Sequence, residues 1–539
     1  MAFTFLSALP LVPTILILTA GYMISFGVYR IFFSPISHIP GPWQAKVTFW
    51  YEFYYDVIVG GQYMFEIFKM HEKYGPVVRI TPHEVHIADP DFYDQVYAGG
   101  TKRRDKPELF SRSGGVPESV FGTSKHELHR LRRAALNPFF SKAKVRALQP
   151  QMQKVIETFL MRLRTFQYTG QPMSASLGFA ALSNDIAVQY AFGRNDNRTE
   201  AEDFAPSFHN ASLSAAKSSK MIKIAPWIFP AMQMLPDSIT VKVNPDMASY
   251  LNLQRGLRTQ ITRIRGDFSA SKFPDNIPST IFHSILANPD LPASEKSTFR
   301  LGQEGQVTVF AGTVTTAQTL SWAIYYLISQ PSDLRRLKEE LLTAIPNPCE
   351  MPLVAELESL PMLTACIQES LRLSHGFTTR LPREAPDEAL VFDAGPNYNF
   401  NGDEELERKS KHWVIPPGTP MSTITPIIHW NERIFPEPYS FVPQRWIENP
   451  RLDRYLVSFN KGTRACVGIN LAYSEMALTL ASVFRRYGAR FGGEETKFEG
   501  DEGVLELWET SERDVRIVTD ATVPTTWSGS QGVRIKVTE

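Results

Sequence analysis

One short stretch late in the chain combines residue types that can hold a redox-active metal. Phe459, Gly462, Arg464, Cys466 and Gly468 follow the order F-x-x-G-x-R-x-C-x-G. A single cysteine thiolate can be the axial ligand of a haem iron, where it donates electron density and favours cleavage of the O–O bond. Such a sulfur needs hydrogen-bond donors around it, and glycines let backbone N–H groups come close because they lack Cβ. The pattern predicts Cys466 as the ligand of a haem iron.

The other residues of this stretch suit the same centre. Arg464 has the fork geometry to bind a haem propionate, and Phe459 would cover one side of the loop and exclude water. The apolar run after Cys466 begins a helix whose N-terminal dipole favours an anionic sulfur. The alternative is an ordinary buried cysteine, the commoner fate of this residue type. Because five of the ten positions match the motif, the sequence favours Cys466 as a metal ligand over an ordinary buried cysteine.

The motif resembles the cysteine loop of the cytochrome P450 family, the haem-thiolate monooxygenases. Nearly everything after residue 38 resembles that family, with five motifs in the family's order. The resemblance implies a mainly α fold with small β-sheets and one large haem domain behind an N-terminal transmembrane helix. It divides the chain into an anchor at 1–30, a proline-rich linker at 31–45 and a haem-thiolate monooxygenase domain at 46–539. The implied cofactor is haem b, iron protoporphyrin IX.

Composition narrows the choice of partners and compartment. The chain has 539 residues, 43% of them hydrophobic, and a formal net charge of zero, so nucleic acid is not expected as a partner. The three cysteines, Cys349, Cys366 and Cys466, have neither zinc-type spacing nor a disulfide framework. That pattern suits a reducing compartment.

The N-terminus reads as a membrane anchor. The first 29 residues carry no charged side chain, and the run from Leu9 to Tyr29 is about long enough to cross a lipid bilayer as a helix. Positive charge follows at Arg30 and Lys46, which places the body in the cytosol. A cleaved signal peptide would have a basic start and a shorter apolar run, and a buried helix would show a polar face. We expect an uncleaved single-pass anchor in the endoplasmic reticulum membrane.

Three basic positions outside the cysteine loop match residues that bind haem propionates in the family. His129 and Arg133 lie four apart on one face of a helix expected from His126 until Pro138. Many family members have tryptophan at the first position, but histidine also donates a hydrogen bond. Arg380 is the first arginine of a segment, Thr379 to Arg383, that matches a strand. Without the resemblance, the cluster at 126–140 reads as a solvated face or a partner-binding patch. A reductase could dock on Arg130 and Arg132.

A long central helix is expected between Ala293 and Gln330, where no proline occurs. In its middle, Ala311 to Thr316 resembles the family's small-Gly-x-acid-Thr pattern, in which the threonine helps to deliver protons during oxygen activation. Thr315 matches that catalytic threonine, and Ala311 is a candidate pocket residue. Val314 departs from the pattern because it stands where an acid is usual. Either Thr313, Thr315 and water relay the proton, or the chain depends less on that route.

Two further motifs concern support and substrate. Glu369 and Arg372 form an E-x-x-R pair, and the segment from Phe435 to Trp446 supplies Arg445. In the family these three side chains form a buried network behind the haem, so we assign them a structural role. Phe377, Thr378 and Thr379 precede Arg380 and would face the substrate.

Several elements are expected from local patterns alone. Residues 74–80 and 84–87 alternate like two strands around a turn, and 532–537 reads as a last strand. Residues 415–419 form a turn that leads into a strand, and 150–290 is helical in pattern. The apolar, proline-broken segment from Met221 to Met234 would cap a pocket, dip into the membrane or pack in the core.

The resemblance implies oxidation of a small apolar substrate with O2. Electrons would come from NADPH through a separate cytochrome P450 reductase, with cytochrome b5 as a further candidate donor, because no flavin domain is attached. Residues 51–87 resemble fungal, trichodiene-oxygenase-like members of secondary metabolism, which suggests a terpenoid substrate. Two alternatives remain. One is a haem-thiolate isomerase, dehydratase or ring-forming enzyme, and the other is a haem-binding protein without turnover.

Overall fold

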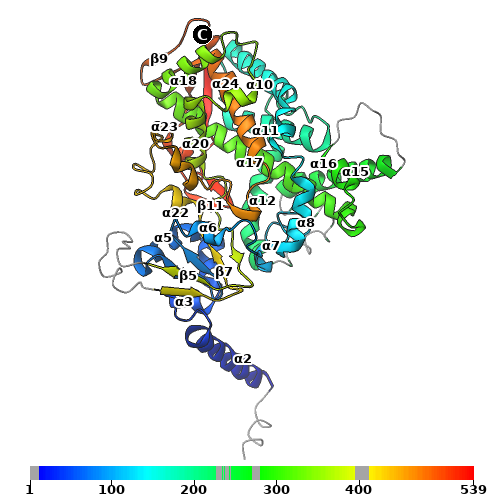
Figure 1. Cartoon of the computed structure of the whole chain (residues 1–539), viewed down its shortest axis with the longest axis vertical. Helices are drawn as coiled ribbons and strands as arrows, with labels where there is room; N and C mark the ends of the chain where they lie inside the picture. Colours follow the sequence, from blue (N-terminus) through cyan, green and yellow to red (C-terminus); the bar gives the residue numbers. More distant parts are fainter. Residues whose placement is uncertain are drawn as a thin grey trace, which may run out of the picture. The chain divides into compact units, whose positions relative to one another are not determined.

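A computed structural model describes residues 11–225, 227, 234, 236, 239, 242, 245–269, 280–394 and 412–539. The chain divides into two compact units (Figure 1). Unit 1 comprises Met1–Val96, Arg103–Asp105 and Leu381–Thr423. Unit 2 comprises Tyr97–Lys102, Lys106–Arg380 and Ile424–Glu539. Every candidate site residue named above belongs to unit 2.

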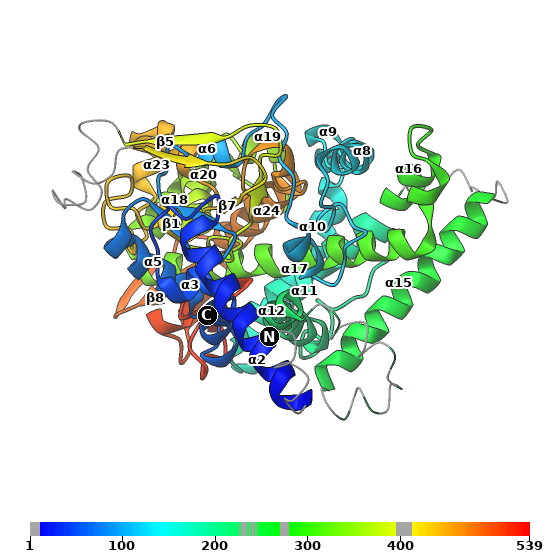
Figure 2. The ribbon, with the colours of Figure 1, turned by 90° about the horizontal axis from the view of Figure 1, so that it is seen from below.

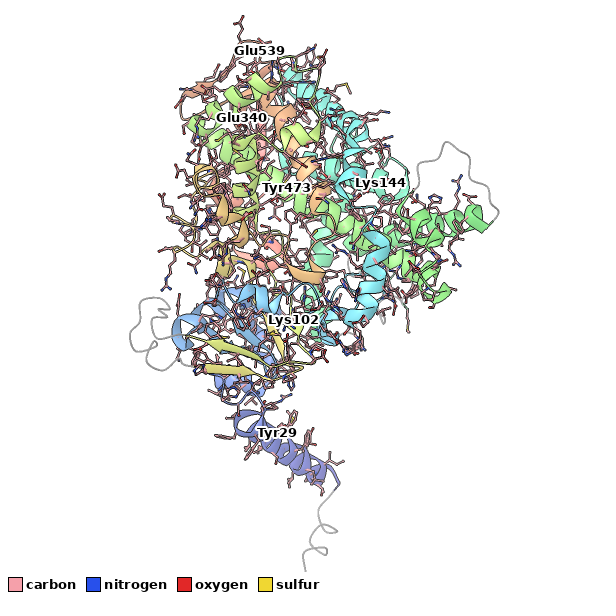
Figure 3. All side chains as sticks on the ribbon, viewed as in Figure 1. Tyr29, Lys102, Lys144, Glu340, Tyr473 and Glu539 are labelled. Carbon is pink, nitrogen blue, oxygen red and sulfur yellow. The ribbon has the colours of Figure 1, made fainter. Side chains whose placement is uncertain are left out.

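Unit 1 starts with the apolar helix α2 (Leu11–Val28), which runs on into the π-helical turn η2 (Tyr29–Phe33). By length and composition, Pro13–Phe33 is the one span of the described residues that could cross a membrane, and none of it is buried. Figure 3 shows side chains projecting outward along this helix, with Tyr29 near its end. An apolar helix whose side chains are not buried suits a membrane anchor.

The body of unit 1 is a small sheet in the order β1-β2-β7-β4. The predicted strands at 74–80 and 84–87 are confirmed as the antiparallel pair β1 (Val77–Arg79) and β2 (Val85–Ile87). The predicted turn at 415–419 is also confirmed, since it leads from β6 (His412–Ile415) into β7 (Pro420–Ser422). The other elements of unit 1 are α3 (Trp43–Val47), α4 (Trp50–Phe53), η3 (Tyr54–Ile58), α5 (Tyr63–Tyr74), α6 (Tyr93–Val96), β4 (Arg383–Glu384) and β5 (Leu390–Asp393).

The expected strand from Thr379 to Arg383 is mostly wrong. Only its last residue is in a strand, β4 (Arg383–Glu384), while residues 377–382 have no regular structure. Pro382 has no N–H to give to a ladder, which explains why pairing begins after it. Arg380 and its three predecessors therefore lie on irregular backbone.

Unit 2 is built around α17 (Thr298–Ser329), the long helix expected between Ala293 and Gln330. The Ser297 side chain caps its first turn by accepting a hydrogen bond from the Arg300 N–H at 3.2 Å. Its 32 residues give a length of about 48 Å. It packs against α11 (Ala175–Phe192), α15 (Pro245–Ser269), α20 (Pro361–Ser374) and α24 (Ile469–Arg486), and Figure 2 shows it crossing the middle of the helical unit.

Gly312 lets α17 and α11 approach closely. A Cβ at this position would lie 3.0 Å from the Ala187 Cβ, which is tighter than ordinary contact. The space that a side chain at Gly312 would need is therefore occupied by α11, so Gly312 allows the close packing of the two helices.

The rest of unit 2 is mostly helical, and most described residues of 150–290 lie in helices, as expected. The segment from Met221 to Met234 continues from α12 into residues outside the described part. The helices are α7 (Glu108–Arg112), α8 (His126–Leu136), α9 (Lys142–Arg146), α10 (Gln149–Thr169), α12 (Ser207–Ile224), α16 (Ile281–Ala287), η4 (Ala293–Lys296), α18 (Pro331–Ala344), α19 (Val354–Leu357), α22 (Thr425–His429), α23 (Gln444–Glu448), η5 (Pro450–Tyr455), η6 (Gly462–Arg464) and η7 (Glu512–Val515).

Two sheets complete unit 2. One has the order β3-β13-β10-β8-β9, and the other is the hairpin β11-β12. The predicted last strand is confirmed as β13 (Arg534–Thr538). The other strands are β3 (Met173–Ser174), β8 (Tyr487–Phe491), β9 (Glu494–Thr496), β10 (Gly503–Leu507), β11 (Thr519–Ala521) and β12 (Val523–Thr525).

Candidate functional site

The Cys466 loop is tied into unit 2 on both sides. The Cys466 N–H donates to the Phe459 carbonyl at 2.8 Å, and the Phe459 ring lies 5.4 Å from the Tyr473 ring on α24. Figure 3 labels Tyr473 inside the helical unit. Gly462 has φ +72°, and a Cβ there would lie 2.2 Å from the Tyr97 carbonyl oxygen. Only glycine fits this turn, so the loop that presents the thiol has one accessible shape.

The Cys466 thiol is exposed and makes no disulfide. Enclosure by the surrounding protein raises the pKa of its thiol, while the Gly468 N–H and the Arg133 guanidinium lower that pKa. A sulfur with a backbone donor and a nearby cation is suited to bind a metal as the thiolate. No three His, Cys, Asp or Glu side chains gather into a metal site anywhere in the described chain. A metal on Cys466 would therefore take its other ligands from a cofactor, as haem iron does.

Two arginines join helix α8 and the residues before it to the cysteine loop. Arg464 donates to the carbonyl oxygens of Thr123 and Ser124, both at 2.6 Å. Arg133 donates to the Ala465 carbonyl at 2.8 Å. The Arg133 pKa is lowered by burial and raised by Cys466 and Glu304. The structure thus places Arg133 near the thiol and uses Arg464 to hold the cysteine loop against residues 123–124.

The other two predicted propionate ligands, His129 and Arg380, are both buried, at 4% exposure each. His129 lies one helical turn before Arg133 on α8. Together with one thiol, this donor set fits an iron porphyrin that carries two propionates.

Glu369, Arg372 and Arg445 meet in one buried network. Glu369 accepts two hydrogen bonds from Arg372, each at 2.8 Å, and one from Arg445 at 3.2 Å. Arg372 also donates to the carbonyls of His429, Pro438 and Ser440. All three charged side chains are at most 9% exposed.

Sequence analysis missed two donors of this network. The Trp446 Nε1–H donates to Glu369 at 2.9 Å, and the Val442 N–H donates to it at 2.9 Å. Trp446 stands next to Arg445 in the quoted segment, so the adjacent tryptophan was the available signal. Four donor groups now satisfy one carboxylate, which makes Glu369 the centre of the network.

On α17, Thr315 is half-buried and its hydroxyl donates to the Ala311 carbonyl at 3.0 Å. Thr313 is fully buried; its hydroxyl donates to Val309 and accepts from the Asn184 amide of α11 at 3.1 Å. Thr313 is therefore committed to helix packing. Of these two threonines, Thr315 is the one with accessible surface.

Val314 does not stand in a polar site. It is 3% exposed and packs in a cluster with Ala216 of α12 and Val523 of β12, flanked by Leu213 and Phe310. An aliphatic side chain at this position closes the space between α17, α12 and the β11-β12 hairpin.

Two of the predicted pocket residues form hydrogen bonds with two charged side chains that no sequence motif predicted. Thr378 donates to Asp520 at 2.8 Å, and the Lys220 ammonium donates to Thr379 at 3.1 Å and to Asp520 at 2.5 Å. Lys220 and Asp520 stand 300 residues apart in the chain, so no local spacing could have predicted the pair. The Phe377 ring lies 6.3 Å from the Phe121 ring, and Ala311 is half-buried.

The expectation that Arg132 helps to dock a reductase is wrong. Arg132 is 4% exposed and donates to Glu295 at 2.6 Å, Glu118 at 3.0 Å and Thr123 at 2.8 Å. Arg130 is exposed and remains a candidate. On a helix, neighbouring residues point about 100° apart, so two adjacent or near-adjacent arginines can have opposite environments.

Comparison with known proteins agrees with the interpretation of the Cys466 loop as a haem-binding site. The family model described as "Cytochrome P450" matches residues 40–507. The chain is 47% identical to "Cytochrome P450 monooxygenase tpcC" of Cochliobolus heterostrophus, over 96% of this chain and 95% of that protein. It is 44% identical to "Cytochrome P450 monooxygenase astB" of Talaromyces wortmannii, over 96% of each. It is 37% identical to "N-acetyltryptophan 6-hydroxylase ivoC" of Emericella nidulans, over 89% of this chain and 91% of that protein.

Proposed function

The chain belongs to the cytochrome P450 family and is a monooxygenase, and on that premise we propose that it oxidises an apolar secondary metabolite by hydroxylation or epoxidation, in one or several steps. Electrons come from NADPH through a separate cytochrome P450 reductase, with cytochrome b5 as a further donor. The observation that supports this most directly is the Cys466 loop, which Arg464 and Arg133 tie to the region of α8.

Haem b bound through Cys466 would supply the reductive activation of O2. The residues of the chain have separate tasks around it. The Gly468 N–H would stabilise the sulfur as thiolate, and His129, Arg133, Arg380 and Arg464 would hold the propionates. The Phe459 ring shields the loop from water.

On α17, the Thr315 hydroxyl would hold and pass a proton. It donates its hydrogen to the Ala311 carbonyl and can exchange that bond for one to a water molecule. Val314 contributes no proton because it has no titratable group, and its cluster excludes water. Protons therefore arrive at Thr315 through solvent.

We propose a terpenoid as substrate. The support is the likeness of residues 51–87 to fungal, trichodiene-oxygenase-like enzymes, together with the apolar cluster around Val314. The relative named N-acetyltryptophan 6-hydroxylase shows that an aromatic substrate occurs within the same range of similarity. The metabolite that accumulates when the gene is deleted separates the two, since a terpenoid supports the proposal and an indole contradicts it.

A second candidate is a haem-thiolate isomerase, dehydratase or ring-forming enzyme in the same kind of pathway. The specific observation in its favour is Val314, an aliphatic residue where the family usually has an acid. Incubation with reductase, NADPH and isotopically labelled O2 separates the two reactions. Label in the product supports the monooxygenase, whereas product without label supports the second candidate.

The central experiment tests Cys466 as the metal ligand. Reduced wild-type protein treated with carbon monoxide should show the shifted absorption band typical of a thiolate ligand. Cys466→Ala should lose that band. Cys349→Ala is the matched control, because Cys349 is also an exposed free cysteine and its replacement should leave the band unchanged. Survival of the band in Cys466→Ala contradicts the assignment.

We further propose that α2 anchors the protein in the endoplasmic reticulum membrane with the catalytic domain in the cytosol. The apolar, unburied span Pro13–Phe33 supports this, as do the positive charges of Arg30 near its end and Lys46 after it. Protease added to sealed microsomes should digest the catalytic domain without detergent. Protection of the domain would contradict the orientation.

A further inference from the structure

Lys220 and Asp520 form a buried ion pair beside the proposed substrate site. The Lys220 Nζ lies 2.5 Å from the Asp520 Oδ2, and the two side chains are 8% and 4% exposed. Lys220 is on α12 and Asp520 is on β11, so the pair joins α12 to the β11-β12 hairpin, and these also contribute Ala216 and Val523 to the Val314 cluster. Removing two charges from water is costly, and the apolar cluster already joins these elements. The pair therefore calls for a role beyond joining them.

The Asp520 carboxylate is held by several donors besides the lysine. Its Oδ1 accepts from the Thr378 hydroxyl at 2.8 Å and from the Thr522 N–H at 2.9 Å. Thr378 is fully buried, and its N–H donates to the Thr522 carbonyl at 3.2 Å. These bonds fix the carboxylate, and the carboxylate fixes the ammonium of Lys220.

Lys220 in turn determines how the Thr379 hydroxyl is oriented. An ammonium has hydrogens to donate and no lone pair to accept with, so the Lys220–Thr379 contact at 3.1 Å uses a lone pair of the Thr379 oxygen. The hydroxyl hydrogen must then point away from the lysine. Among the described residues, Thr379 makes no hydrogen bond other than the one from Lys220. Thr379 is buried but retains 9% exposure, whereas Thr378 has none.

We propose that Thr379 is a specificity-determining hydrogen-bond donor for an oxygen atom of the substrate, and that Lys220 and Asp520 orient its hydroxyl. This inference rests on the proposed function, in which residues 377–379 face the substrate. The substrate class is a polycyclic, mainly apolar molecule that carries a carbonyl, ether or hydroxyl oxygen. A pure hydrocarbon would leave this buried donor without a partner, which is unfavourable. An earlier oxygenation or hydration step must therefore supply the substrate.

The test compares two probes with one skeleton. 5α-Androstan-3-one carries a carbonyl that can only accept, and 5α-androstane lacks it. Their dissociation constants are measured on the full-length haem-loaded protein from the absorbance change on binding. We expect the ketone to bind about tenfold more tightly than the hydrocarbon, the effect of one well-made hydrogen bond. Equal affinities in the wild-type protein overturn the proposal.

Variants assign the preference to named groups. Thr379→Val removes only the hydroxyl and should bring the ratio close to one, whereas Thr379→Ser should keep it. Lys220→Met, and the double variant Lys220→Met with Asp520→Asn, should reduce the ratio because the hydroxyl is no longer oriented. Ser219→Ala is the matched control: it removes a bond between α12 and Thr522 at 2.7 Å but none to Thr379, so the ratio should stay unchanged.

Two measurements keep the possible failures apart. The carbon monoxide band of every variant shows whether the haem-thiolate site is intact, and loss of that band in the wild-type protein would contradict the proposed function itself. An intact band with an unchanged ratio in Thr379→Val overturns only the inference about Thr379. If Lys220→Met does not fold, Thr379→Val still decides, because valine and threonine have nearly the same shape.

Discussion

Val314 packs against Val523, so the middle of α17 is sealed against the β11-β12 hairpin by two aliphatic side chains. Ala216 of α12 completes the contact. The position that carries an acid in many related enzymes is therefore part of the apolar core in this chain. An acid placed there would have no polar partner among the residues of the cluster.

We expect Val314→Glu to reduce stability without improving catalysis. Burial of a carboxyl group in this cluster should lower the free energy of unfolding by about 3 kcal/mol or more, and the coupling of NADPH consumption to product should not rise. Val314→Ala, the control without charge, should cost about 1–2 kcal/mol through the cavity it leaves. Urea unfolding and product-to-NADPH ratios measure the two effects. A stable Val314→Glu protein with improved coupling would show that the acid can be accommodated and used.

Trp446→Phe should weaken the network around Glu369. The substitution keeps an aromatic ring but removes the N–H that lies 2.9 Å from Glu369, and we expect a loss of about 1–3 kcal/mol in the free energy of unfolding. Glu369→Ala should cost more, about 3–5 kcal/mol, because it leaves Arg372 and Arg445 buried without their carboxylate.

Denaturant unfolding and haem content per protein measure these losses. Trp43→Phe serves as the control because Trp43 is 66% exposed and should be nearly neutral. If Trp446→Phe is as stable as that control, Trp446 adds nothing to the network.

Glu475 on α24 should make stability depend on pH. It is 1% exposed, with the Ser183 hydroxyl at 2.5 Å. The pKa of Glu475 is raised from its ordinary value of 4.5 to about 8. Burial causes this rise, and the hydrogen bond from the Ser183 hydroxyl opposes it only in part. Between these two pH values the folded protein binds more protons than the unfolded chain, so raising the pH destabilises the fold. Above about pH 8 both states are ionised and the effect stops growing.

The measurement is the melting temperature at pH 5.5 and at pH 8 for the wild-type protein and for Glu475→Gln. The glutamine amide of Glu475→Gln cannot ionise. The variant should therefore avoid the loss of stability, on the order of a few kcal/mol, that the wild-type protein has at the higher pH. The variant should therefore gain most at pH 8. Identical pH dependence in the two proteins would show that Glu475 does not titrate in this range.

Arg130 and Arg132 should have different roles despite their proximity in sequence. Arg130→Glu should raise the concentration of reductase needed for half-maximal activity by a few-fold, and the effect should shrink at high salt because surface charges are screened. Arg132→Met should instead lower stability, since it leaves Glu295 with a broken buried ion pair.

Reductase titrations at low and high salt, with thermal unfolding of both variants, separate these roles. A reductase effect of Arg132→Met without any loss of stability would contradict the buried position of Arg132.

Local spacing was enough to predict several parts of this protein. The cysteine loop, the Glu369–Arg372 pair and the long helix without proline depend on residues at most a few tens of positions apart. Their geometry follows from helix periodicity and turn chemistry, which operate over one or two turns. The hairpin of β1 and β2 and the last strand were predictable for the same reason. The expected strand at Thr379–Arg383 failed because strand pairing depends on a distant partner, and Pro382 cannot pair.

The sequence by itself predicted the haem-thiolate character of this protein, because the proposed ligand Cys466, the Gly468 N–H and the turn at Gly462 lie within ten consecutive residues. Only the tertiary structure decided which side chains surround the other face of the site. The burial of Arg132, the apolar contacts of Val314 and the Lys220–Asp520 pair all join segments that are distant in the chain. Such contacts form where packing brings helices and hairpins together, and their free energy comes from burial and complementary charge rather than from local conformation. No pattern of nearby residues encodes them.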